Sequence, residues 1–160
     1  MYPLDDETLA SNLQRGQPAA LAPLVERHHQ RLFGYLYRLT NGNRALAEDL
    51  AQESFVRAIT HIHLYQYPRP FKAWLYQIAT NLARDEFKRA DTRHVEAMPD
   101  DAELLADSAS LEEDLQQAHT VQALVGAFAT LPDQQRETLL LRYYQDFSLL
   151  DIAETLHIPL

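Results

Sequence analysis

Apolar residues recur every three or four positions along most of this chain, and that spacing limits the possible folds more than any other feature. Residues 19–40 show it clearly, because Leu21, Leu24, Val25, Leu32 and Leu36 repeat at helical intervals. No segment alternates apolar and polar residues with the period of two expected of a half-buried strand. The 160 residues include only 4 glycines, while alanine and leucine, which favour helix, are frequent. We therefore predict an all-α fold with no sheet.

Turn and capping residues mark where the predicted helices end. Gly16 and Pro18 interrupt the pattern, Asn41-Gly42-Asn43 interrupts it again, and a Tyr- and Pro-rich connection covers residues 64–70. Near the C-terminus, Pro132 suits the first position of a helix and Ser148 suits an N-cap. The predicted helices cover residues 5–15, 19–40, 45–63, 71–93, 111–130, 133–145 and 149–156.

The composition changes after residue 94. Residues 95–118 contain eight Asp or Glu and no Lys or Arg, and the first part of this stretch has no sustained apolar stripe. Ser110 and Glu113 then form a capping-box signature that opens the next helix. We predict a helical domain at residues 1–94, an acidic linker at 95–110 and a second helical unit at 111–160.

The segment FKAWLYQIATNLARDEFKR, residues 71–89, is predicted to be a helix with two occupied faces. One face is an apolar stripe spanning about 100° of arc, formed by Phe71, Trp74, Leu75, Ile78 and Leu82. The opposite arc carries a ring, amides, a hydroxyl and two cations but no carboxylate: Tyr76, Gln77, Thr80, Asn81, Arg84 and Lys88. Residues 61–94 hold six Lys or Arg against three Asp or Glu, a sum of +3 in a chain of net charge −9.

This polar arc has two interpretations. It suits a nucleic-acid surface, in which cations neutralise phosphates, amides and hydroxyls bond to bases, and rings stack on unpaired bases. It also suits a face that is merely solvated. Tyr65, Tyr67 and Arg69 belong to the neighbouring Pro-stiffened loop, where the two rings either hold extruded bases or pack onto the body of the protein.

Composition argues against several other classes of protein. The chain has no Cys, which excludes disulfides and thiolate metal sites. Neither His28-His29 nor His61-Ile62-His63 has the i,i+4 spacing that aligns two metal ligands on a helix. The sequence holds no phosphate-binding loop or nucleophile motif, no secretory signal and no apolar run near the ~20 residues that span a bilayer. We expect a cytoplasmic protein without enzymatic activity, metal, cofactor or membrane insertion.

Four segments follow one another in an order and spacing that carry a family resemblance. They are LASNLQRGQPAALAPLVERHHQRLFGYLYRLTNGN, ALAEDLAQESFVRAI, FKAWLYQIATNLARDEFKR and LPDQQRETLLLRYYQDFSLLDIAETLHIPL. The second is similar to an AEDLxQExF segment that binds core polymerase, the third to an F-x-x-W-L-x-x-I-A-x-N segment of region 2, and the fourth to the start of region 4. The chain thus resembles a bacterial RNA polymerase sigma factor of the extracytoplasmic-function (ECF) group of the sigma-70 family.

The resemblance implies a factor that brings RNA polymerase core to promoters and melts the −10 element. The helix of residues 45–63 would dock on the clamp helices of the polymerase's largest subunit through one acidic face: Glu48, Asp49, Gln52, Glu53 and Val56. The loop of residues 64–69 would capture a flipped base, and Asn81 matches an asparagine that faces DNA in the family, with Arg84 and Lys88 continuing that face. The linker would either thread toward the polymerase active-site channel or act as a solubilising tether.

The region 4 resemblance stops before the recognition helix of a helix-turn-helix, so no residue is predicted to read the −35 element. We expect this incomplete unit to leave Leu139, Tyr143, Ile152 and Leu156 short of packing partners, and residues 111–160 to be less stable than residues 5–94. A second hypothesis is a sigma-like interaction module that binds core polymerase or an anti-sigma protein without supporting initiation.

Overall fold

The computed structural model describes residues 3–93, 123–124 and 126–160, and every regular element within those ranges is helical. The N-terminal bundle contains α1 (Asp6–Gln14), α2 (Leu21–Leu39), α3 (Arg44–Thr60) and α4 (Phe71–Arg93), with the 3₁₀ turns η1 (Pro18–Ala20) and η2 (Ile62–Leu64). The C-terminal helices are α6 (Asp133–Leu139), the π-helical turn η4 (Leu140–Tyr144) and α7 (Leu149–Leu156). The all-α prediction is confirmed for the described residues.

Side-chain caps set the starts of three helices. The Asp5 carboxylate accepts the Thr8 N–H at 2.7 Å and so opens α1. The Asn43 side chain accepts the Leu46 N–H at 3.1 Å, and the Ser148 hydroxyl accepts the Asp151 N–H at 3.0 Å. Each cap satisfies a backbone donor that has no partner within its own helix. The predicted cap at Ser148 is confirmed, but Pro132 is the N-cap of α6 and not its first residue.

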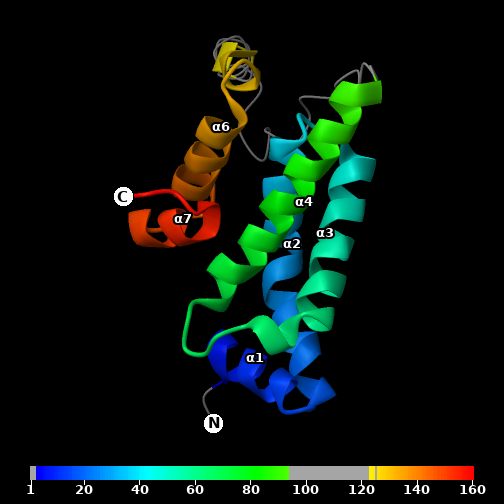
Figure 1. The fold of residues 1–160 in the computed structure, drawn as a ribbon, viewed down its shortest axis with the longest axis vertical. Helices are drawn as coiled ribbons and strands as arrows, with labels where there is room; N and C mark the ends of the chain where they lie inside the picture. Colours follow the sequence, from blue (N-terminus) through cyan, green and yellow to red (C-terminus); the bar gives the residue numbers. More distant parts are fainter. Residues whose placement is uncertain (1–2, 94–122, 125) are drawn as a thin grey trace, which may run out of the picture.

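The core of the bundle lies where α2, α3 and α4 run side by side (Figure 1). Leu32 and Leu36 of α2, Ala51 of α3 and Leu75 of α4 are fully buried there. The apolar stripe predicted on residues 71–89 faces this core, with three members buried and Trp74 and Ile78 partly buried against it. This burial is the main source of stability in a helical bundle.

The C-terminal helices pack along α4, on the side of it away from α3 (Figure 1). Their apolar residues Leu141, Phe147 and Ile152 join the same buried cluster as the bundle. The expectation that Ile152 and Leu156 lack packing partners is wrong, because they are only 2% and 4% exposed. The predicted linker and most of the predicted helix at 111–130 lie outside the described residues.

Candidate nucleic-acid interface

The polar arc of α4 is covered at its centre. We predicted that Tyr76 and Thr80 face outward, but both are buried, at 0% and 1% exposure. The Thr80 hydroxyl hydrogen-bonds the Tyr35 hydroxyl of α2 at 2.8 Å, and the Tyr76 ring lies 5.0 Å from that of Phe147, centroid to centroid. The prediction fails for Tyr76 because Phe147 and α7 pack on this face, and for Thr80 because its side chain turns toward α2.

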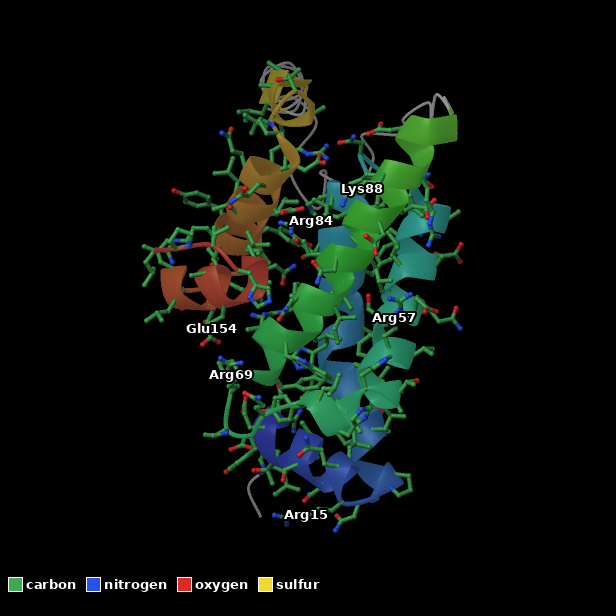
Figure 2. All side chains as sticks on the ribbon, in the orientation of Figure 1. Arg15, Arg57, Arg69, Arg84, Lys88 and Glu154 are labelled. Carbon is green, nitrogen blue, oxygen red and sulfur yellow. The ribbon has the colours of Figure 1, made fainter. Side chains whose placement is uncertain are left out.

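Arg84 joins α4 to α6 through two hydrogen bonds. Its Nε donates to Glu137 Oε1 at 2.9 Å and its Nη2 donates to Oε2 at 2.5 Å. The Glu137 side chain is wholly buried, whereas that of Arg84 is 32% exposed, and Figure 2 shows Arg84 between the two helices. The hydrogen bonds to Glu137 raise the pKa of Arg84 above its ordinary value. A paired fork of this kind fixes both position and orientation.

Gln145, just after η4, makes a second polar junction with the bundle. Its side-chain amide accepts a hydrogen bond from the Tyr76 hydroxyl at 2.9 Å and donates one to the Arg31 backbone carbonyl at 3.0 Å. Its backbone carbonyl accepts a hydrogen bond from Lys72 Nζ at 3.2 Å. Burial raises the pKa of Tyr76 and lowers that of Lys72. Every group in this junction is therefore paired, as buried polar groups must be if they are not to destabilise the fold.

The remaining members of the polar arc differ in exposure. Gln77 is half-buried and its amide contacts the His157 ring at the end of α7. Asn81 and Lys88 are exposed, and Lys88 lies toward the same end of α4 as Arg84 (Figure 2). The structure thus divides the predicted arc into three parts: Tyr76, Gln77 and Arg84 contact the C-terminal part of the chain, Thr80 contacts α2, and Asn81 and Lys88 are exposed.

The loop of residues 61–70 places its two tyrosines differently. Tyr65 is buried, with its ring 5.6 Å from that of Trp74 and its hydroxyl donating to the Arg69 carbonyl. Of the two interpretations of the loop tyrosines, the structure supports packing onto the body for Tyr65, because its buried ring completes an aromatic cluster with Phe71. Its predicted place among the DNA-binding residues is corrected accordingly. Tyr67 is 59% exposed and Arg69 is exposed beside it.

The predicted acidic face of α3 is open. Its five residues, Glu48, Asp49, Gln52, Glu53 and Val56, are all exposed. Four of them line a groove between α3 and α4, whose other wall includes Leu82, Asp85 and Glu86 of α4. Asp85 and Glu86 were not predicted to be part of this surface. The sequence does place both residues beside the apolar stripe of α4 and off the polar arc, which could have indicated that they lie next to α3.

Among the described residues, no group of three His, Asp or Glu side chains could hold a metal ion. Within the same ranges no helix is both long and apolar enough to cross a membrane.

Comparison with known proteins decides the family. Residues 24–93 match the family model Sigma-70 region 2, and residues 122–160 match Sigma-70, region 4. The ECF RNA polymerase sigma factor SigW of Bacillus subtilis is 32% identical over 158 residues, covering 92% of this chain and 82% of SigW. The chain belongs to the sigma-70 family. Its relatives place it in the ECF group, as the sequence predicted.

Other relatives of this sigma factor agree. The ECF sigma factor SigE of Mycolicibacterium smegmatis is 33% identical over 86% of this chain, which spans 53% of SigE. A solved structure of CnrH in complex with the cytosolic domain of CnrY has the same fold, with a TM-score of 0.68 and 23% identity over 96% of this chain and 84% of that one. Sigma factors of this group act in transcription initiation with RNA polymerase and promoter DNA, and they are not enzymes.

Proposed function

We propose that this sigma factor directs RNA polymerase core to promoters and opens the −10 element by holding unpaired DNA on α4 and on the loop of residues 61–70. The observation that carries the proposal is the excess of cations in residues 61–94, +3 within a chain of −9, on a segment matched as Sigma-70 region 2. An acidic protein repels DNA over most of its surface, so a local basic segment defines where a DNA strand can bind.

Two exposed groups supply the first contacts. Lys88 neutralises phosphate, and the Asn81 amide both donates to and accepts from a base edge. Tyr67 and Arg69 extend the same surface from the loop, where an exposed ring stacks on an unpaired base. Arg84 becomes available to phosphate only when Glu137 is withdrawn.

Core polymerase binding is assigned to the acidic face of α3 and the groove beside it. Glu48, Asp49 and Glu53 give this surface a negative charge, which favours a basic partner helix. Val56, 49% exposed, offers an apolar contact at the same place. Helix α3 lies on the opposite side of α4 from the C-terminal helices (Figure 1). Core polymerase on α3 and DNA on α4 can therefore be bound at once.

A decisive test uses holoenzyme reconstituted with RNA polymerase core and promoters selected by the wild-type factor from a randomised duplex library. The double variant Asn81→Ala, Lys88→Ala should bind core normally but reduce permanganate reactivity of −10 thymines about tenfold, because a base contact and a phosphate contact are lost. Arg15→Ala, which removes a cation at the opposite end of the molecule from Lys88 (Figure 2), should have no effect. Normal promoter opening by the double variant would refute the proposed DNA surface.

A second candidate function is favoured by the covering of Tyr76, Gln77 and Arg84. A factor that stayed in this arrangement would retain its core-binding face while withholding part of its DNA surface, and would act as an interaction module for core polymerase or for an anti-sigma protein. The same holoenzyme assay separates the two: core binding without any promoter-dependent transcript would favour the interaction module.

A further inference from the structure

Helix α1 contacts the loop that carries the proposed base-binding side chains. The match to Sigma-70 region 2 begins only at residue 24, so α1, at Asp6–Gln14, lies outside it. Two of its side chains nevertheless hydrogen-bond to the loop of residues 61–70 and to the helix that follows, across 48 to 64 residues of sequence. This contact is specific, because it uses side-chain polar atoms and backbone groups rather than apolar packing alone.

Gln14 holds the first half of the loop. Its Nε2 donates to the Ile62 carbonyl at 2.8 Å and to the Tyr65 carbonyl at 2.5 Å. A glutamine amide nitrogen has two N–H groups, and here both are used on the same loop. The pair of bonds fixes the distance between the turn η2 and the residue that follows it.

Glu7 holds the far end of the loop. Its Oε1 accepts the Phe71 N–H, the first backbone donor of α4, at 3.1 Å. Residues Arg69 and Pro70 precede this helix and its first turn has no acidic residue, so the local sequence offers no carboxylate or hydroxyl for the helix start. Glu7 supplies the missing acceptor from another helix and places a carboxylate at the positive end of α4.

Between these two anchors the loop has a rigid inner side and an open outer side. The buried Tyr65 ring packs on Phe71 and Trp74, and its hydroxyl bonds to the Arg69 carbonyl. On the outer side, Gln66, Tyr67 and Arg69 remain exposed. An ordered backbone that presents exposed side chains is preorganised for a ligand, since little conformational entropy is left to lose on binding.

We propose that α1 is a positioning element of the promoter site, in which Gln14 and Glu7 fix the loop of residues 61–70 so that its outer side chains select one unpaired base. The inference rests on the proposed function and adds residues outside the family match. Phosphate contacts from the cations of α4 do not depend on the loop, so loosening it reduces discrimination among bases more than overall affinity.

The test uses holoenzyme made from RNA polymerase core and the full chain, presented with a pool of random-sequence single-stranded DNA. Bound strands are sequenced and the enrichment of each base is calculated. We expect wild-type holoenzyme to enrich one base at one position. Gln14→Ala and Glu7→Ala should each reduce that enrichment about fivefold, as expected for loss of one or two hydrogen bonds. The total amount of bound DNA and the affinity for core polymerase should each change less than twofold, because neither variant removes a proposed contact with phosphate or with core.

Matched variants separate positioning from simple destabilisation. Glu7→Gln keeps an oxygen that accepts the Phe71 N–H, so it should retain most of the selectivity that Glu7→Ala loses. Gln17→Ala removes an exposed glutamine three positions after Gln14 whose side chain does not cap the turn η1, and it should select as wild type does.

Each contrary result has one meaning. If wild-type holoenzyme enriches no base, the proposed function falls and this inference falls with it. If wild type selects a base and both alanine variants select it equally well, the inference alone is overturned. If the alanine variants lose affinity for core polymerase by the same factor as base enrichment, α1 stabilises the fold as a whole. That result also overturns the inference.

Discussion

At the scale of single residues, the charged groups of this sigma factor act as links between helices. Asp6 of α1 accepts a hydrogen bond from His28 Nε2 at 2.7 Å and another from Arg27 Nη1 at 2.9 Å, both on α2. The His28 hydrogen bond is the main cause of a lowered pKa for Asp6, with burial opposing it and Arg27 adding to it. The carboxylate therefore stabilises the junction of α1 and α2 in its charged form.

The lowered pKa of Asp6 predicts how the free energy of unfolding depends on pH. A carboxyl with a lowered pKa in the folded state contributes stability above its unfolded pKa, and that contribution is lost as pH falls through the folded pKa. We expect Asp6→Asn to reduce the free energy of unfolding by about 1–2 kcal/mol at pH 7. The difference from wild type should shrink below about pH 4. Urea unfolding across that pH range measures it, with the exposed Asp49→Asn as control. A deficit independent of pH would contradict the assignment.

At the scale of elements, helix positions were predictable because their signals are local. Asn41-Gly42-Asn43 ends α2, with Asn41 and Gly42 both at positive φ, and Ser148 caps α7 as its spacing indicates. The faces of α4 were less predictable. Angular position correctly assigned the apolar stripe, but a polar face covered by another part of the chain and a polar face in water have the same sequence pattern. Tyr76 and Thr80 are buried because Phe147 and Tyr35 lie over them, and no neighbour in sequence carries that information.

The C-terminal helices should behave as a weaker cooperative unit than the bundle. Their apolar residues Tyr143 and Leu149 are 79% and 61% exposed, so these two side chains contribute little burial to the C-terminal unit. We expect faster amide exchange in α6 to α7 than in α2 to α4. Ser148→Ala, which removes the cap of α7 at a cost of about 1 kcal/mol, should accelerate exchange in the C-terminal helices alone.

A cap on another element provides the comparison. Asn43→Ala removes the equivalent bond at the start of α3, within the bundle on which the C-terminal helices rest. It should therefore accelerate exchange in both parts of the molecule. Hydrogen-exchange mass spectrometry reads out both variants by segment. Uniform acceleration by Ser148→Ala would mean that the described residues unfold as one unit.

At the scale of the whole molecule, the proposed function gives one surface of α4 two partners that exclude each other. In the structure, Arg84 and Tyr76 donate hydrogen bonds to Glu137 and Gln145. The proposed function needs part of the same surface for DNA. The interface combines these polar pairs with buried apolar side chains, among them Phe147 and Ile152. Exposing it to water therefore costs free energy that the contacts with DNA must offset.

Under the proposed function, Asn81 and Lys88 reach DNA directly, whereas contact between Arg84 and phosphate requires the C-terminal helices to leave α4. The stability of the contact between those helices and α4 then sets how readily Arg84 becomes available.

Removing Glu137 should favour the open form, in which the C-terminal helices have left α4. Glu137→Ala deletes the acceptor of both Arg84 hydrogen bonds, and the partly exposed Arg84 then turns to water. We therefore expect the population of the open form to rise about tenfold.

Fluorescence energy transfer measures the open population. Because the chain has no native cysteine, the substitutions Arg15→Cys and Glu154→Cys can carry a donor and an acceptor dye, one at the end of α1 and one on α7 (Figure 2). In the labelled protein that also carries Glu137→Ala, energy transfer should be low even without DNA. In the labelled protein that keeps Glu137, energy transfer should fall only when core polymerase and single-stranded DNA are added. Glu26→Ala, an exposed carboxylate on α2, should leave transfer unchanged. If Glu137→Ala kept full transfer and bound DNA no better, the covered face of α4 would not regulate access to promoters.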